Sequence, residues 1–122
     1  MKHLLNGLTA EPKVELISVK KTILKEKNKV ECLIVCNEDS VTTDLNLLKK
    51  IIATMEIIKE LYSKYNIDFR YTLSTINLLE SDNIDENKKI IKLLKNAEIY
   101  YLNNPEYLET INRMNEKTHK RA

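Results

Sequence analysis

One stretch of the sequence, Val30–Cys36, constrains the fold more than any other part of the chain. Glu31 is its only polar residue, and every other position is apolar. A run that is apolar at successive positions is typical of a central strand covered on both faces, as in parallel sheets. Polar residues follow directly at 37–40. The sequence therefore predicts a buried strand over residues 30–36, with other elements packed on both of its sides.

A helix is predicted directly after this strand. Apolar residues recur at helical spacing over 48–62, which gives the helix one packing face. Thr42 or Thr43 can cap its first turn, where Asp44 is favourably placed. The helix is expected to end at about residue 65, because Asn66 suits a C-terminal stop.

The rest of the chain continues the alternation of strand and helix. Residues 67–73 alternate apolar and polar side chains, as a strand with one buried face does. Residues 82–95 have the spacing of a helix, 97–102 form a third strand, and Asn104-Pro105 marks the start of a last helix. We therefore expect one small α/β domain of two or three layers over residues 1–122, with a mostly parallel sheet. The basic tail, 117–122, is expected to fray.

Residues 12–27 fit two interpretations. Leu16, Ile17 and Val19 lie on one side of a helix if the segment is helical. Ile17, Val19 and Ile23 also fit one face of a strand, and residues 25–29 would then form the turn of a hairpin that leads into the strand at 30–36. The sequence leaves helix and hairpin open.

Composition argues against several kinds of function. The chain has one glycine, so a glycine-rich phosphate loop is close to excluded. Its two histidines, His3 and His119, lie outside the predicted elements, and a nucleophilic site would lack a positioned base. The 20 basic and 18 acidic residues nearly balance, which does not indicate a dedicated nucleic-acid-binding protein. Because the apolar runs are too short for a membrane span or a signal peptide, we expect a cytoplasmic protein without membrane contact.

The two cysteines are expected to be free and buried. Cys32 and Cys36 lie four residues apart on the predicted strand, which separates their Cα atoms by roughly 13 Å. A disulfide needs less than about 7 Å, and zinc needs both sulfurs at about 2.3 Å. Free thiols fit a reducing compartment.

Polar residues follow each of the three predicted strands. The carboxyl ends of parallel strands meet at one edge of a sheet, where α/β proteins bind ligands. We therefore predict a ligand-binding site there, although the same residue types also serve in ordinary turns and caps. The predicted site consists of Asn37, Glu38, Asp39, Ser74, Thr75, Asn103 and Asn104.

Acidic residues could add chemistry to this edge. Glu38 and Asp39, together with Asp68 or Asp82, could bind magnesium or transfer protons if they converge. Adjacent acids in a loop are usually only solvated, so we predict no catalytic residue, no metal site and no cofactor. Tyr100 and Tyr101 are neighbours on one strand and are expected to point to opposite faces of the sheet.

Residues 66–102 carry a resemblance to a known family. Residues 67–71, Glu86-Asn87 and 93–102 resemble the non-catalytic, phospholipase-D-like sensor domains attached to some archaeal transcription regulators and sensor kinases. Catalytic members of that fold need a His-x-Lys motif with a downstream acid, whereas His119 here is followed by Lys120 and Arg121. The resemblance implies a binding or regulatory module that does not hydrolyse a substrate.

The hairpin interpretation resembles a second family. A hairpin followed by helix, strand, helix and strand is similar to a small nucleotidyltransferase domain. That family needs a Gly-Ser followed by an Asp-x-Asp pair. The matching place is Lys29-Val30-Glu31, where only Glu31 is acidic and no Gly-Ser precedes it. This resemblance implies a domain that is inactive as an enzyme.

These observations favour a non-enzymatic regulator or inhibitor that contacts a small ligand or a protein partner, and we expect a homodimer. One alternative is a degenerate nucleotidyltransferase-like or other phosphate-handling enzyme, which would need Glu38, Asp39 and Asp68 in one pocket. The other is a nucleic-acid-binding module, which would need the hairpin lysines to join the basic tail in one face. The residues of that face would be Lys20, Lys21, Lys25, Lys27, Lys29, Lys117, Lys120 and Arg121.

Overall fold

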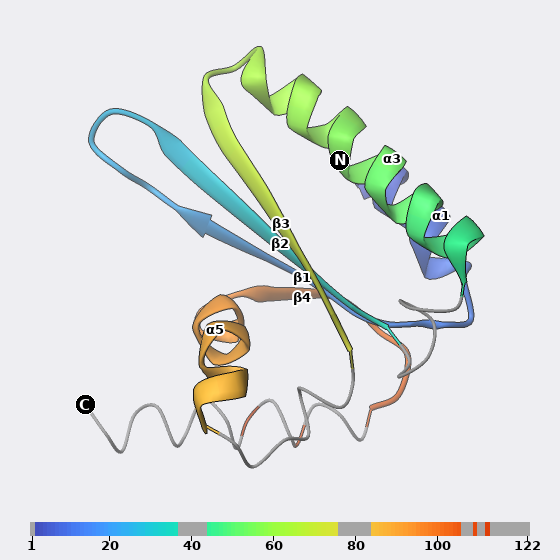
Figure 1. Cartoon of the computed structure of the whole chain (residues 1–122). Coiled ribbons are helices and arrows are strands. Elements are labelled where there is room, and N and C mark those ends of the chain that lie inside the picture. Colours follow the sequence, from blue (N-terminus) through green and yellow to red (C-terminus); the bar gives the residue numbers. More distant parts are fainter. Residues whose placement is uncertain (1, 37–43, 76–83, 106–108, 110–111, 113–122) are drawn as a thin grey trace.

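The fold consists of a four-stranded sheet with helices on both faces (Figure 1). The structure is a computed structural model, and it describes residues 2–36, 44–75, 84–105, 109 and 112. Along the chain, the elements are α1 (Lys2–Thr9), β1 (Val14–Thr22), β2 (Asn28–Cys36), α3 (Leu45–Ser63), β3 (Ile67–Thr75), α5 (Ile84–Leu94) and β4 (Glu98–Leu102).

The sheet is mixed, with the strand order β3-β2-β1-β4. β2 and β3 are parallel, whereas β1 is antiparallel to both β2 and β4. The α/β class is confirmed, but the prediction of a mostly parallel sheet was wrong. β1 forms a hairpin with β2 on one side and pairs with β4 on the other. It therefore lies between them and runs against both. β2, β3 and β4 still run in one direction, yet β4 has no parallel neighbour.

The two faces of the sheet have separate hydrophobic cores. α1 and α3 cover one face and α5 covers the other (Figure 1). On β2, Cys32, Ile34 and Cys36 pack under α1 and α3, while Leu33 and Val35 pack under α5. The prediction that this apolar run is covered on both sides is therefore confirmed, although the strand begins earlier, at Asn28.

The structure decides between the two interpretations of residues 12–27 in favour of the hairpin. Leu16 packs on the α5 side of the sheet, while Ile17 and Val19 pack on the opposite side. In a helix, Leu16, Ile17 and Val19 would share one side and could not pack into two different cores. Ile23, which the hairpin interpretation placed on a buried strand face, is instead 89% exposed beyond the end of β1.

The ends of α3 follow local rules. Asp44 is the N-cap, and its carboxylate accepts a hydrogen bond from the backbone N–H of Leu47 at 3.0 Å. The predicted caps, Thr42 and Thr43, lie outside the described residues. The predicted stop is confirmed, because Asn66 has the left-handed φ of 58° that ends helices.

One described helix was not predicted at all. In α1, Leu5 and Leu8 are fully buried against the α3 side of the sheet. Their spacing was a signal for an amphipathic turn, but eight residues with one central glycine are a weak helix on their own. The predicted last helix and the tail at 117–122 lie almost entirely outside the described residues.

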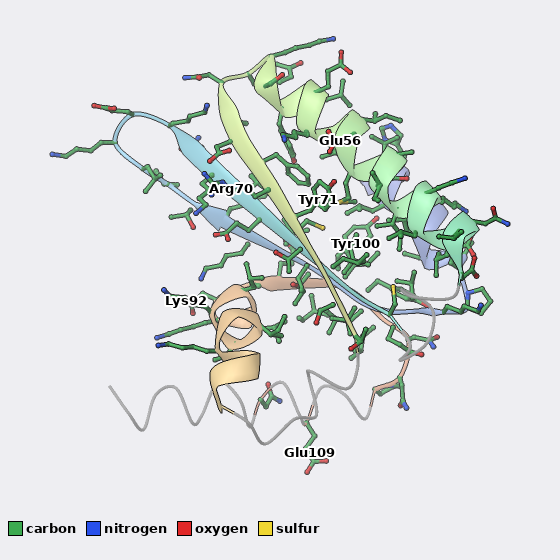
Figure 2. All side chains as sticks on the ribbon, viewed as in Figure 1. Glu56, Arg70, Tyr71, Lys92, Tyr100 and Glu109 are labelled. Carbon is green, nitrogen blue, oxygen red and sulfur yellow. The ribbon has the colours of Figure 1, made fainter. Side chains whose placement is uncertain are left out.

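Tyr100 and Tyr101 do not point to opposite faces as predicted. Ile17 pairs with Tyr101 and Ser18 pairs with Ile99, so Tyr100 is an extra residue in a β-bulge. Both tyrosines pack on the α1 and α3 side, and Figure 2 shows Tyr100 there. The Tyr100 hydroxyl donates a hydrogen bond to Asn6 of α1 at 2.8 Å.

Candidate functional site

The carboxyl ends of β2 and β3 are neighbours, but the end of β4 lies far from them. Across the sheet, Ser74 pairs with Val35, Val35 with Leu16, and Leu16 with Leu102. Ser74 and Leu102 thus lie at the two ends of this row, three strand spacings or roughly 14 Å apart. The same end of the sheet carries both groups of predicted residues, but it does not bring them into one pocket.

Only part of the predicted site can be placed. Ser74 and Thr75 end one edge strand, β3, while Asn103 and Asn104 follow the other edge strand, β4. The three remaining residues, Asn37, Glu38 and Asp39, lie outside the described residues. The prediction of a site at this edge therefore remains a prediction for its central part.

Asn103 contacts a residue that sequence reasoning missed. Its side-chain amide donates a hydrogen bond to the carboxylate of Glu15 at 3.2 Å, and its backbone N–H donates to the Glu15 carbonyl oxygen at 2.9 Å. Tyr101 donates its hydroxyl to the Asn103 side chain at 3.2 Å. Glu15 is buried, and the signal for it was one acidic residue inside the apolar stretch 14–19. These contacts fasten β4 to β1, so Asn103 has a structural role.

Ser74 has a feature that a ligand could use. Its side chain is buried, and its hydroxyl has no hydrogen-bond partner among the described residues. Ser18 is buried in the same way on the same face of the sheet. A buried hydroxyl without a partner is unfavourable by about 1–3 kcal/mol, and a bound polar group would remove that cost.

The acidic residues that can be placed do not converge. Asp68 lies at the start of β3, at the opposite end of the strand from Ser74, and its carboxylate accepts a hydrogen bond from Arg70 at 3.2 Å. Glu38, Asp39 and Asp82 lie outside the described residues. Within the part of the chain that the structure describes, no group of three or more His, Cys, Asp or Glu residues could hold a metal ion.

The cysteines are buried and unbridged, as predicted. Burial raises the pKa of the Cys32 thiol from about 9 to about 12. Because the thiolate is the reactive form of cysteine, Cys32 is inert at neutral pH and packs as a small apolar residue between β2 and α3.

The outer side of α3 carries apolar residues that the sheet does not use. Leu47, Ile51, Met55 and Ile58 form the buried side of the helix. Ile57, Leu61 and Tyr65 follow one another at a spacing of four residues and are 49%, 42% and 76% exposed. Residues four apart lie on the same side of a helix, so Ile57 and Leu61 are neighbours on α3, and Tyr65 follows in the turn after the C-cap Lys64. We call these three residues the α3 stripe.

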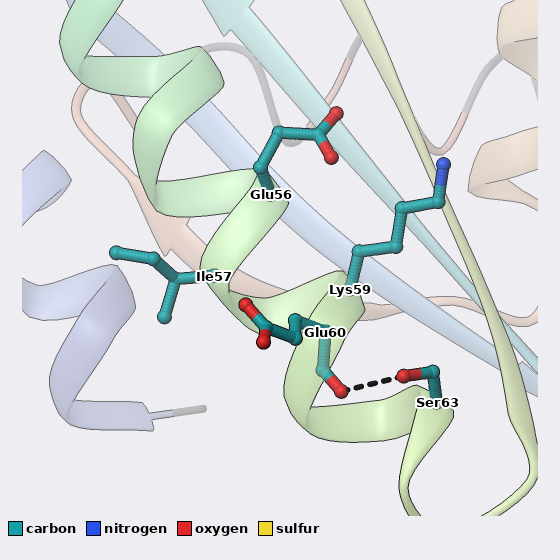
Figure 3. Close-up of a pocket in the computed structure, with 5 residues that line it drawn as sticks. All are labelled: Glu56, Ile57, Lys59, Glu60 and Ser63. Carbon is teal, nitrogen blue, oxygen red and sulfur yellow. Dashed lines mark hydrogen bonds between the residues drawn. The ribbon is translucent and has the colours of Figure 1, made fainter.

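A surface hollow adjoins the α3 stripe. Figure 3 shows Glu56 and Lys59 on the β3 side of the helix and Ile57 on the α1 side. The Ser63 hydroxyl donates to the carbonyl oxygen of Glu60 at 2.7 Å. The hollow is lined by charged side chains without a histidine or cysteine. It has the composition of a polar rim around an apolar contact and not that of an enclosed catalytic pocket.

No protein-family model matches the chain, and neither a curated protein nor a solved structure matches it. Among the helices of the described residues, none is both long enough and apolar enough to cross a membrane.

Proposed function

We propose that the protein is a non-enzymatic binding module of the cytoplasm that acts as a regulator or inhibitor by contacting a protein partner. The α3 stripe is the contact surface. The observation that carries the proposal is that Ile57 and Leu61 are exposed side by side on α3, next to the exposed Tyr65 that follows the end of the helix.

The surroundings of the α3 stripe support a protein as the partner. Tyrosine is enriched at protein interfaces, and interfaces combine an apolar centre with a polar rim. Here the neighbouring exposed charges are balanced, with two acids, Glu56 and Glu60, and two lysines, Lys59 and Lys64. A rim of both signs favours a protein surface of similar mixed charge over a polyanion.

A charge placed in the α3 stripe tests the proposal. Leu61→Glu puts a carboxylate into the apolar line, and Ala53→Glu is the matched control because it adds the same charge at an exposed position of the same helix. Both changes are on the surface and should alter the free energy of unfolding by no more than about 0.5 kcal/mol. Affinity capture from cells of the source should recover a protein with the wild type and with Ala53→Glu, but not with Leu61→Glu.

The same variants separate two kinds of partner. If the partner is a second copy, light scattering will give a dimer mass for the wild type and for Ala53→Glu and a monomer mass for Leu61→Glu. If all three proteins are monomers and capture the same set of proteins, the α3 stripe is not a contact surface and the proposal is wrong.

A further inference from the structure

The connection between β1 and β2 carries a charge unlike that of the rest of the chain. Residues 20–29 contain five lysines and one glutamate, so their net charge is +4, whereas the whole chain carries +2. All other residues together therefore carry −2. Most of the basic excess of the protein is concentrated in one hairpin.

The end of this hairpin projects from the body of the molecule. β4 pairs with β1 only as far as Val19, and β3 begins beside Asn28 of β2. Residues 23–27 between the two strands thus have no neighbouring strand. In Figure 1 this connection extends away from α1, α3 and α5.

Three of the five lysines are exposed, two of them at the projecting end and one on the adjoining part of β1. Lys21, Lys25 and Lys27 are exposed and make no hydrogen bond or ion pair within the described part of the chain. The other two are engaged, because Lys20 donates to the backbone carbonyl oxygen of Lys92 at 2.8 Å and Lys29 lies 3.7 Å from the carboxylate of Glu31. We call residues 20–29 the arm. The arm therefore offers three ammonium groups to an anionic ligand.

The residue types of the arm indicate what that ligand is. Residues 20–29 contain no arginine and no aromatic residue, so the arm lacks the planar guanidinium group that pairs with guanine through two parallel hydrogen bonds and the rings that stack on unpaired bases. Lysine contacts phosphate as a point charge. The bend of the arm is charged, at Lys25-Glu26, which opposes insertion into a lipid bilayer. Phosphates of a nucleic-acid duplex fit this chemistry best.

We propose that the β1–β2 hairpin is an arm that binds the phosphate backbone of double-stranded DNA without reading its sequence. A two-stranded β-ribbon fits the major groove of B-DNA, which is about 12 Å wide. Ile23 and Leu24 are 89% and 51% exposed just before the bend, so the bend itself adds no positive charge on its β1 side. The inference goes beyond the protein-binding proposal and is independent of it, because the α3 stripe contributes no residue to the arm.

Binding to a labelled duplex tests the inference. Fluorescence anisotropy of the full chain with a duplex of about 20 base pairs should show affinity that falls as salt rises. For three phosphate contacts, the slope of log K against log salt is about −2.7, which gives a roughly 40-fold loss between 50 and 200 mM salt. Changing Lys21, Lys25 and Lys27 together to glutamine should abolish binding at both salt concentrations.

A second triple variant controls for total charge. Lys49, Lys88 and Lys92 are exposed on α3 and α5, and changing them to glutamine removes the same three charges outside the arm. This control should bind within about 3-fold of the wild type, because sequence-independent affinity follows the phosphate contacts that are made. Equal loss in both triple variants would show a general charge effect and overturn the inference.

Two other ligands complete the test, beside the duplex itself. Absence of duplex binding at 50 mM salt would overturn the inference, as would tighter binding to a single strand of the same length. Binding to vesicles that contain anionic lipid, without binding to the duplex, would also overturn it and would identify the arm as a membrane contact.

Discussion

The face of the sheet under α1 and α3 and the face under α5 are built in different ways. Among the described residues, fourteen buried side chains form the core under α1 and α3, but only six form the core under α5. Toward the hairpin, the α5 face becomes polar, with Lys20, Glu31 and Arg70 on neighbouring strands in one row. Among the described residues, the first face therefore has the larger apolar core, and the second carries charged side chains that are paired near the surface.

Hydrogen bonds differ between the two faces as well. Under α3, Tyr71 donates its hydroxyl to Glu56 at 3.0 Å, and Figure 2 shows both side chains between β3 and α3. Under α5, the buried hydroxyls of Ser18 and Ser74 have no partner among the described residues. The apolar face is thus also the better satisfied one, which is the arrangement expected of a structural core.

The largest effect is expected when a cavity is made in each core. Ile34→Ala, under α3, should lower the free energy of unfolding by about 3–5 kcal/mol, because the surrounding side chains cannot collapse into the space. Leu94→Ala, at the end of α5, should cost about 2–3 kcal/mol, because the smaller core can relax. Urea unfolding measures both values. An equal or larger loss for Leu94→Ala would contradict the comparison.

High pH should destabilise the protein through the α3 face. The Cys32 thiol has its pKa raised to about 12 by burial, so it stays protonated in the folded state while the unfolded chain releases the proton above about pH 9. Its contribution is fully present below pH 9 and is lost as pH rises toward 12, by about 1.4 kcal/mol per pH unit. Burial also raises the pKa values of Tyr62 and Tyr71, which adds to the loss in the same direction.

Urea unfolding at pH 8, 9, 10 and 11 measures this loss. Between pH 9 and 11, Cys32 alone should account for about 2–3 kcal/mol. Cys32→Ala is the control, since it removes the titrating thiol and should reduce the pH dependence by the share of Cys32, even though it lowers stability at every pH. A wild type as stable at pH 11 as at pH 8 would contradict the prediction.

Removing a hydroxyl from the α5 face should have a smaller effect of opposite sign. Ser74→Ala should raise the free energy of unfolding by about 0.5–1 kcal/mol, because the unpaired buried hydroxyl is lost. Ser63→Ala is a useful contrast, since its hydroxyl donates to the Glu60 carbonyl oxygen at an exposed site. A loss of stability in Ser74→Ala would show that the hydroxyl already has a partner in the free protein, and would remove this support for a ligand site at the edge.

The smallest effect is expected in the charged part of the α5 face. Arg70→Gln breaks the pair in which the Arg70 Nε lies 3.2 Å from the Asp68 carboxylate. Because the Arg70 side chain is largely exposed, the change should cost no more than about 0.5 kcal/mol. Thermal unfolding at low and high salt measures it. A loss comparable to that of Leu94→Ala would mean that this row is part of the core and not a free surface.

Local patterns predicted the elements of the chain that depend on local physics. The unbroken apolar run of β2, the amphipathic α3 and its stop at Asn66 each follow from side chains a few residues apart. The segment of β1 could not be decided in this way, because Leu16, Ile17 and Val19 suit both a helix face and a strand buried on two sides. The choice depends on pairing with β2, which a single segment does not contain.

The candidate site was less predictable than the elements. Sequence reasoning gathered seven polar residues at one edge by assuming a mostly parallel sheet, whose strand ends meet there. The strand order β3-β2-β1-β4 instead places Ser74 and Asn103 at opposite sides of the sheet. Glu15, the contact of Asn103, and the α3 stripe were both missed, because their importance depends on what lies beside them in space.

By itself, the sequence determined which of the described segments after residue 28 are strands and helices, that the cysteines are buried and that the basic excess lies in residues 20–29. These properties depend on the order of side chains along the chain. Only the tertiary structure decided the strand order, the direction of β1, the side to which Tyr100 points and the exposure of the α3 stripe. Each of these depends on contacts between residues far apart in the sequence, whose free energy no local pattern contains.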